Sequence, residues 1–370
     1  MTIGILKEPS GENRVSALPD IVANYVKMNV VVMVERDAGA KAFATDADYQ
    51  KAGASIADRS EVIAKSDLLL SIQMPEENIS GKVLIGVFQP LFHFNKIKSW
   101  ADQQNTIFSI DIIPRTTRAQ AMDVLSSQAN IAGYKAVLTA CTEYGRYFPM
   151  FMTAAGSIAP AKLLILGAGV AGLQAIATAK RLGAVVEVFD TRPAVKEEVQ
   201  SLGAKFVEVE GAADASAAGG YAVEQSEEYK QKQQQRIAES VAKADIVITT
   251  AQIPGKKAPI LLTDAMIDSM RNGSIIVDLA SATGGNTNFT KNNETVMRGG
   301  VKIIGNSNLA STMPSDASKM YGKNILNFLK LIIDKDGNLH LNFDDELVKE
   351  TCVATAGKVT NERVSALLQS

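Results

Sequence analysis

The chain has 370 residues, of which 46% are hydrophobic and 21% are charged, so it can bury a large core, and its length favours two domains. The formal net charge of -2 provides no concentrated basic surface, which argues against a nucleic acid or an anionic membrane as a partner. No basic segment leads into an apolar one at the N-terminus, so no secretory signal peptide is expected.

The first third of the sequence alternates short apolar runs, which favour strands, with runs that favour helices. The expected strands are Ile3–Leu6, Val30–Val34, Leu68–Ile72, Val83–Phe88 and Ile107–Ile110. Helices are expected at Pro19–Met28 and near Ser60–Lys65. Alternation of this kind is typical of a parallel sheet with helices on both faces.

A polar segment that begins at Asp111 interrupts this pattern, and residues 127–150 are expected to form a long helix that crosses to a second domain. The alternation resumes from Ala161. The expected strands of this second region are residues 163–166, 185–189, 205–208, 245–250, 274–279 and 301–304. Six strands suit a complete dinucleotide-binding fold.

The chain is then expected to return to the first domain through a helix at Met320–Ile332, whose apolar residues recur at helical spacing. A short helix at Asp344–Val353 is expected to be the last. The predicted fold class is α/β, with two doubly wound, Rossmann-like domains whose mainly parallel sheets are linked by long helices. The predicted domains are residues 1–126 with 316–370, and residues 127–315.

The sequence from Leu163 to Asp190 reads as a strand, a glycine-rich turn, a helix, a second strand and an acidic residue. Gly167 permits the tight turn, Gly169 lets the backbone approach a pyrophosphate, and Gly172 lets the helix pack against the strand. A carboxylate about 20 residues further on is where such folds bind ribose hydroxyls. This context favours a dinucleotide site over a glycine-rich helix start without a ligand.

Residues that follow later strands are expected to complete the nucleotide site. The carboxylate of Asp190 would repel a 2′-phosphate, which favours NAD over NADP, whereas the guanidinium of Arg192 could accommodate that phosphate. Thr250, Ala251 and Gln252 follow another strand at the carboxyl edge of the sheet, where open α/β folds bind ligands. They are expected to form a wall of the cofactor site.

Residues 210–221 are small or polar, and Tyr221 is their only aromatic residue. Irregular stretches of this length inside a compact domain are usually lids or linkers. A lid with Tyr221 as its contact to a nucleotide is the preferred interpretation, and a slack insertion is the alternative.

Polar side chains also cluster just before the long helix between the domains. Asp123 and Ser126 are three residues apart and share a face if the segment is helical, while Arg115 and Gln120 precede them. These residues could face a nicotinamide, because hydride transfer needs positioning more than an acid. The alternative is an ordinary polar helix start in which Asp123 compensates the helix dipole.

Cysteine and histidine are scarce, with two of each in the chain. Cys141 and Cys352 have neither metal nor redox spacing, and His93 and His340 share no motif with a second ligand. We therefore expect a reducing compartment and no metal site.

Several motifs give the chain a resemblance to a known family. They are Ile3-Gly-Ile-Leu-Lys-Glu8 with Asn13-Arg-Val15, the block Pro114-Arg-Thr-Thr-Arg-Ala-Gln-Ala-Met-Asp-Val-Leu-Ser126, and Phe189-Asp-Thr-Arg-Pro193. Nearly the whole chain resembles the family shared by alanine dehydrogenase and the NAD(H)-binding component, domain I of the alpha subunit, of proton-translocating NAD(P) transhydrogenase. The block at 114–126 is more similar to the transhydrogenase branch.

The resemblance implies a set of residues around bound NAD. In the block before the long helix these are Arg115, Gln120, Ala121, Met122, Asp123 and Ser126, at the nicotinamide end. In the second domain the implied residues are Gly167, Gly169, Val170, Gly172, Asp190, Thr191, Arg192, Gly220, Gln233, Thr250, Ala251 and Gln252. Those expected to act in catalysis are Arg115, Gln120, Asp123, Ser126 and Tyr221.

Two positions distinguish the branches of this family. Alanine dehydrogenases carry a substrate-binding lysine and a catalytic histidine where this chain has Gln73 and Gln89. A glutamine amide cannot remove the proton that leaves when an amino acid is oxidised, whereas exchange between two nicotinamides has no such requirement. Arg14 matches the arginine that grips the substrate carboxylate in the dehydrogenases, and we expect it to be structural here.

The resemblance thus implies an NAD(H)-binding subunit of a Re/Si-specific, proton-translocating transhydrogenase. Such a subunit exchanges hydride directly between its NADH and the NADP+ held by a partner subunit, while a separate membrane-spanning subunit moves the proton. A homodimer is expected, located peripherally on the cytoplasmic or matrix side of a membrane without entering it. The alternatives are an NAD-dependent alanine dehydrogenase and a redox-sensing NAD-binding module without catalysis.

Overall fold

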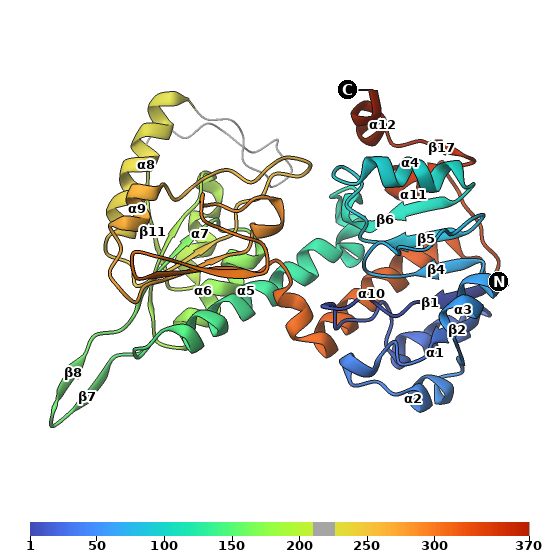
Figure 1. Cartoon of the computed structure of the whole chain (residues 1–370), viewed down its shortest axis with the longest axis horizontal. Coiled ribbons are helices and arrows are strands. Elements are labelled where there is room, and N and C mark those ends of the chain that lie inside the picture. The colour runs from blue at the N-terminus through green and yellow to red at the C-terminus, as the bar shows by residue number, and fades with distance from the viewer. Residues whose placement is uncertain (210–225, 370) are drawn as a thin grey trace. The chain divides into compact units, whose positions relative to one another are not determined.

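The structure, a computed structural model, describes residues 1–209 and 226–369 (Figure 1). The chain divides into two compact units, which are Met1–Gln128 with Ser311–Ser370 (unit 1) and Ala129–Ala310 (unit 2). Each unit contains one large sheet in which parallel pairing predominates, with helices packed on it. The predicted α/β, Rossmann-like fold class is therefore confirmed, while the predicted domain boundaries stay a prediction.

The sheet of unit 1 has eight strands in the order β17-β16-β6-β5-β4-β1-β2-β3. Its strands are β1 (Thr2–Ile5), β2 (Val31–Glu35), β3 (Ser55–Ala57), β4 (Leu68–Leu70), β5 (Val83–Gly86), β6 (Thr106–Ser109), β16 (Cys352–Thr355) and β17 (Lys358–Val359). β1 to β6 pair in parallel, in the strand order of doubly wound folds, and β16 is antiparallel to β6. The order reverses between β1 and β4, so this is the switch point of the sheet.

The sheet of unit 2 repeats the same order, β11-β10-β9-β12-β13-β15, and adds β14 at one edge. Its strands are β9 (Lys162–Leu166), β10 (Val185–Phe189), β11 (Lys205–Phe206), β12 (Ile246–Thr249), β13 (Ile275–Asp278), β14 (Glu294–Arg298) and β15 (Val301–Gly305). Its switch point lies between β9 and β12, which pair in parallel. Ligands of open α/β sheets bind outside the carboxyl ends of the strands at this point.

Helices lie before, between and after these strands. They are α1 (Pro19–Lys27), α2 (Asp46–Lys51), α3 (Arg59–Lys65), α4 (Phe94–Asp102), α5 (Val124–Glu143), α6 (Val170–Arg181), α7 (Lys196–Ser201), α8 (Glu227–Val241), α9 (Asp264–Asp268), α10 (Pro314–Ile332), α11 (Glu346–Thr351) and α12 (Glu362–Gln369). None of the helices within the described residues is long and apolar enough to cross a bilayer.

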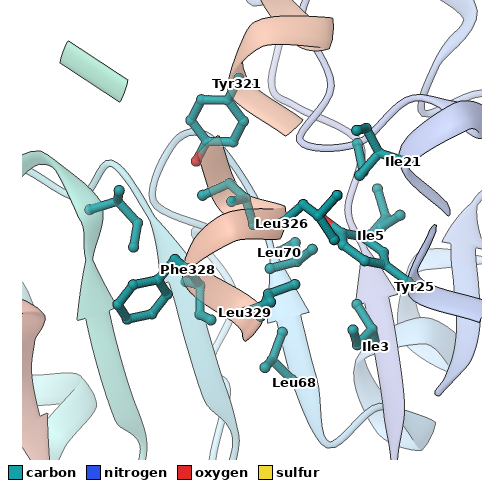
Figure 2. Packing of buried hydrophobic residues seen from close by; sticks show 14 of the residues in the cluster. Ile3, Ile5, Ile21, Tyr25, Leu68, Leu70, Tyr321, Leu326, Phe328 and Leu329 are labelled. Atoms are coloured by element: carbon teal, nitrogen blue, oxygen red, sulfur yellow. The ribbon is translucent and has the colours of Figure 1, made fainter. Parts of the chain in front are cut away.

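The core of unit 1 forms where α10 packs on the sheet (Figure 2). Ile325, Phe328 and Leu329 recur at helical spacing and are fully buried. The ring of Phe328 meets that of Phe108 on β6 edge to face, with 5.3 Å between the centroids. The C-terminal segment of the chain thus covers the sheet that the N-terminal segment builds.

Several elements differ from the sequence-based predictions. The predicted bounds of the helix at 127–150 are wrong at both ends, because α5 begins at Val124 and ends at Glu143. The chain then forms an exposed antiparallel hairpin of β7 (Phe151–Thr153) and β8 (Gly156–Ile158). The helix predicted to be the last is also not the last, since β16, β17 and α12 follow it.

The packing of α10 predicts a large effect of truncating its central ring. Phe328→Ala should lower the free energy of unfolding of unit 1 by about 3–5 kcal/mol, because it removes a fully buried side chain and leaves a cavity. Phe343→Ala, at a residue that is 38% exposed, should change it by less than about 0.5 kcal/mol. Denaturant unfolding followed by circular dichroism measures both, and equal midpoints would contradict this description of the core.

Candidate functional site

The glycine-rich turn of unit 2 connects β9 to α6. Gly167 has a φ of +109°, a left-handed conformation that a side chain would strain. A Cβ on Gly172 would lie 1.9 Å from the Gly167 carbonyl oxygen, so only glycine lets α6 come this close to the turn. Both residues therefore have the local roles that the sequence predicts for them.

Gly169 lies at the N-cap of α6, where a helix has backbone N–H groups without intrahelical partners. No side chain of the described residues caps this helix, and a Cβ on Gly169 would have no described atom within 4 Å. Val170 follows it and is 40% exposed. An open helix N-terminus with space above its backbone fits the pyrophosphate of a dinucleotide.

Asp190 follows β10 beside this turn and is already fully hydrogen-bonded. Its Oδ2 accepts from the Ala168 backbone N–H at 2.7 Å and from Arg192 Nη2 at 2.9 Å. Its Oδ1 accepts from the backbone N–H of Arg192 at 2.8 Å and from Arg192 Nε at 2.9 Å. A carboxylate has about four acceptor positions, so ribose hydroxyls can bind Asp190 only if the Arg192 side chain moves away.

The turn after β12 lies beside the glycine-rich turn, because β9 and β12 are neighbours in the sheet. Thr250 Oγ1 donates to the Gly167 carbonyl at 3.1 Å. The Gln252 side chain donates to the Leu279 carbonyl at 3.0 Å, after β13. Thr250 therefore lies next to the predicted pyrophosphate position, and the side chain of Gln252 is hydrogen-bonded to the residue that follows β13.

The turn at Ala251 is fixed by a residue that was not predicted from the sequence. The fully buried Asn286 accepts from the Ala251 N–H at 3.2 Å and donates to the Ala251 carbonyl at 2.9 Å. Its amide also donates to the Pro259 carbonyl at 2.8 Å. The dipeptide Gly284-Gly285 before it was the available sequence signal.

The remaining predicted residues of unit 2 are less well defined by contacts. Thr191 is half-buried after β10, and Gln233 is half-buried on α8. Gly220 and Tyr221 lie outside the described residues.

In unit 1, the segment before α5 carries the predicted nicotinamide cluster. Arg115, Gln120 and Ala121 are exposed, whereas Met122 is 6% exposed and packs in the hydrophobic core. The side chain of Met122 therefore points away from solvent, which leaves only its backbone to meet a ligand.

Asp123 and Ser126 are brought together by the start of α5. The Asp123 carboxylate accepts from the Ser126 backbone N–H at 2.8 Å and from its hydroxyl at 2.6 Å. The first of these bonds is the one by which an N-cap residue satisfies a free N–H at a helix start. Asp123 thus caps α5, and its bond with the Ser126 hydroxyl fixes the direction of both side chains. That these side chains face a nicotinamide stays a prediction.

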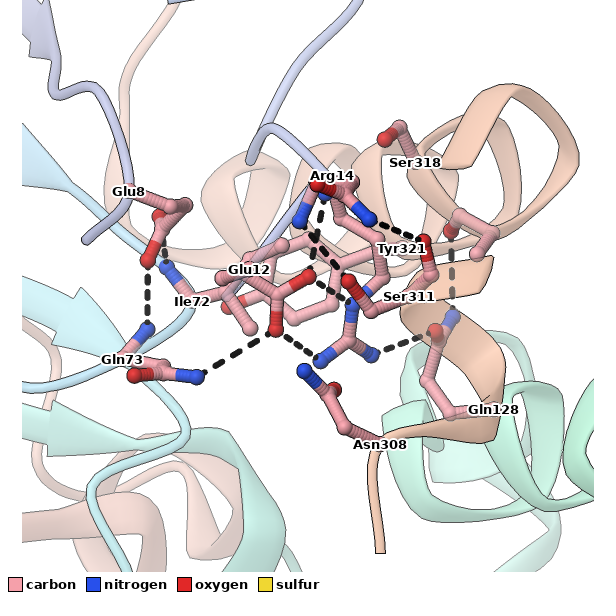
Figure 3. A network of polar contacts seen from close by, with 12 residues as sticks. Glu8, Glu12, Arg14, Ile72, Gln73, Gln128, Asn308, Ser311, Ser318 and Tyr321 are labelled. Atoms are coloured by element: carbon pink, nitrogen blue, oxygen red, sulfur yellow. Dashed lines mark hydrogen bonds and ion pairs between the residues drawn. The ribbon is translucent and has the colours of Figure 1, made fainter. Parts of the chain in front are cut away.

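At the switch point of unit 1, a buried ion pair occupies the position where such folds bind ligands (Figure 3). Arg14 donates from Nη2 and Nε to the Glu12 carboxylate at 2.6 and 2.8 Å, and from Nη1 to Gln128 at 2.8 Å. The side chain of Glu12 is 0% exposed and that of Arg14 is 11% exposed. The two bonds from one guanidinium to one carboxylate are the bidentate geometry of strong arginine–carboxylate pairs.

The side chains of Gln73 and Glu8 lie next to this ion pair. Gln73 donates its amide to Glu12 at 3.3 Å, and Gln89 is exposed with a φ of +47°. Burial raises the pKa of Glu8 to about 7, although the Gln73 and Ile72 N–H groups bound to its carboxylate act in the opposite direction. In this structure Arg14 is paired with Glu12 and Gln128, and its structural role stays a prediction.

Two family descriptions match the chain, and the second extends through residues 311–362, which belong to unit 1 in the structure. The chain matches the family "Alanine dehydrogenase/PNT, N-terminal domain" over residues 4–132 and "Alanine dehydrogenase/PNT, C-terminal domain" over residues 136–362. Together the two matches cover most of the sequence.

Three similar proteins are named as transhydrogenases. The chain is 45% identical to the first section of the NAD(P) transhydrogenase alpha subunit of Rickettsia prowazekii, over 98% of this chain and 96% of that protein. It is 43% identical to the protein of the same name from Rhodospirillum rubrum, over 98% of each. The crystal structure of transhydrogenase from Sinorhizobium meliloti has a TM-score of 0.89 at 43% identity and covers 97% of this chain and 100% of that one.

The surroundings of two glycines predict different effects of the same substitution. Gly169→Ala places its Cβ in open space, so the melting temperature should stay near that of the wild type. The added methyl group should nevertheless weaken NADH binding by about tenfold or more, because it blocks the approach of a pyrophosphate to the backbone. Titration of NADH fluorescence measures the affinity.

Gly172→Ala is the matched comparison. Its Cβ would clash with the Gly167 carbonyl, so both the melting temperature and the NADH affinity should fall. Wild-type NADH affinity in Gly169→Ala would show that the nucleotide does not bind at this turn.

Proposed function

Because this chain belongs to the alanine dehydrogenase/PNT family, we propose that it is the NAD(H)-binding subunit of a Re/Si-specific, proton-translocating NAD(P) transhydrogenase. In this proposal it exchanges hydride directly between its NADH and NADP+ bound to a partner subunit. The observation that carries the proposal is the contrast between the two switch points. Among the described residues, the switch point of unit 2 has space beside the backbone at Gly169, where a pyrophosphate would bind. That of unit 1 holds the Glu12–Arg14 ion pair, and this chain has Gln73 and Gln89 where the dehydrogenases carry a lysine and a histidine.

The residues of unit 2 would hold the nucleotide. The turn at 167–172 and the N-terminus of α6 would bind the pyrophosphate, and Asp190 would accept the ribose hydroxyls once Arg192 has moved away. Thr250, Ala251 and Gln252 would line the site, with Val170, Thr191, Gly220 and Gln233 around it. Bound NADH supplies the hydride.

The residues of unit 1 would orient the reacting ring. Arg115, Gln120, Asp123 and Ser126 would donate and accept hydrogen bonds at the nicotinamide end, with Ala121 and Met122 contributing backbone. Tyr221 would exclude water. Hydride exchange between two nicotinamides requires no proton transfer by the protein, so positioning is the main contribution of these residues.

The partners follow from the proposed reaction. The NADP-binding and membrane-spanning subunits would be other chains, and proton movement would take place in the latter. This chain would act as a homodimer, attached through those subunits to the cytoplasmic or matrix side of the membrane. Its two domains would be residues 1–126 with 316–370, and residues 127–315.

The proposal predicts a reaction that depends on two proteins. The purified chain, mixed with an isolated NADP-binding partner subunit, should transfer hydride from NADH to NADP+ or a spectrally distinct analogue. The chain alone, given alanine and NAD+, should produce no NADH, because Gln73 and Gln89 offer no base. Absence of transfer, with both nucleotides and the partner shown to bind, would reject the proposal, and alanine-dependent NADH would favour a dehydrogenase.

The predicted cluster should affect the rate more than the affinity. Gln120→Ala and Asp123→Asn should each lower the transfer rate at saturating NADH by about tenfold or more while changing the NADH dissociation constant by less than about threefold. The asparagine can still cap α5. Thr117→Ala, an exposed neighbour outside the cluster, should behave as the wild type. Equal losses of rate and affinity would show that the cluster only binds the nucleotide and does not orient it for hydride transfer.

A further inference from the structure

The short 3-10 helix at Thr117–Met122 carries Gln120 and leads directly into Asp123. It is anchored to the core by Ala119 and Met122, which are 2% and 6% exposed. A helix end leaves backbone carbonyls without intrahelical donors. The carbonyl of Ala121, between Gln120 and Asp123, is therefore a place where an external donor can fix this backbone.

Two side-chain amides on α10 supply such donors. Asn324 Nδ2 donates to the Ala121 carbonyl oxygen at 2.8 Å, and Asn327 Nδ2 donates to the same oxygen at 3.2 Å. The two asparagines are three residues apart and share a helix face. Asn324 is only 6% exposed, and an amide buried to this extent is costly unless it is hydrogen-bonded.

The other end of the Asn324 amide holds the start of α5. Its Oδ1 accepts from the Ser127 hydroxyl at 2.7 Å. The Asn324 amide thus connects the Ala121 carbonyl, which precedes Asp123 and Ser126 in the chain, to the Ser127 hydroxyl, which follows them. Gln128 continues the network by donating to Ser127 Oγ at 3.3 Å. It also accepts from Arg14 Nη1 at 2.8 Å (Figure 3).

We propose that Asn324 is a positioning residue for hydride transfer, which acts by fixing the backbone between Gln120 and Ser126. This inference rests on the function proposed above. Displacements of about 1 Å in an oriented reaction can cost about 100-fold in rate. Gln120 is exposed and lies directly before Ala121, so its position depends on the backbone that Asn324 holds.

Two readouts test this role, and one of them needs no partner. Asn324→Leu removes the donor and the acceptor, and Asn324→Asp keeps an acceptor for Ser127 but cannot donate to Ala121. Both should lower the transfer rate at saturating NADH by about tenfold or more, with the NADH dissociation constant within about threefold of the wild type. Hydrogen exchange of the peptide covering residues 115–126 should become faster in both.

Ser318→Ala is the matched control, because Ser318 is buried on the same helix and its described hydrogen bond is accepted from the Val15 N–H and not made to the 117–122 segment. It should lower the melting temperature and leave the transfer rate and the exchange of residues 115–126 unchanged. If Asn324→Leu does not fold, Asn327→Ala, at a half-buried residue, should give the same changes to a smaller extent.

The outcomes separate the two proposals. Unchanged exchange or unchanged transfer in folded Asn324 variants would overturn the positioning role, as would an equal loss of transfer in Ser318→Ala. Absence of transfer in the wild type would instead reject the proposed function, and the exchange measurement would still decide whether Asn324 holds this backbone.

Discussion

The hydrogen bond from the Ala168 amide to the Asp190 carboxylate is the interaction on which the proposed nucleotide site of unit 2 depends. It joins the turn after β9 to the residue after β10, and the Gly167 N–H bonds the Phe189 carbonyl beside it at 2.8 Å. Together these bonds hold Gly167 in its left-handed conformation and bring it against Gly172. A buried N–H left without a partner costs about 1–3 kcal/mol, so Asp190 stabilises the turn before any ligand arrives.

Much of the fold could be predicted from the sequence, because buried parallel strands read as apolar runs and the glycine pattern marks the first crossover of unit 2. The hairpin β7–β8 could not be predicted in this way, since its residues are mostly exposed and show no alternation of burial. The strand β16 could not be recognised in the sequence because it follows α11 without an intervening turn. The bond from Asn324 to Ala121 could not be predicted either, because the two residues are about 200 positions apart in the sequence. The pairing of Arg192 with Asp190 could not be predicted because it depends on side-chain geometry.

The two units show how one strand order can serve two purposes. In unit 2 the switch point is lined by glycine and an open helix start, which leaves room for a ligand. In unit 1 the corresponding place is filled by Glu12, Arg14 and Gln73, and the polar network continues through Gln128 to the segment that carries the predicted nicotinamide cluster. This polar network thus links the switch point of unit 1 to the predicted nicotinamide cluster, and Gln73 and Gln89 are the residues that favour the transhydrogenase branch over the dehydrogenase branch.

The ion pair between Glu12 and Arg14 also restricts how such a chain can change during evolution. Removing one partner leaves the other buried and uncompensated, at a cost of about 3–5 kcal/mol, whereas replacing both with apolar residues of similar volume is often neutral. A path of single substitutions therefore passes through an unstable intermediate. Related chains would therefore keep both residues even after the pair had lost any role in catalysis. An arginine found at this position in related chains would not by itself indicate a substrate site.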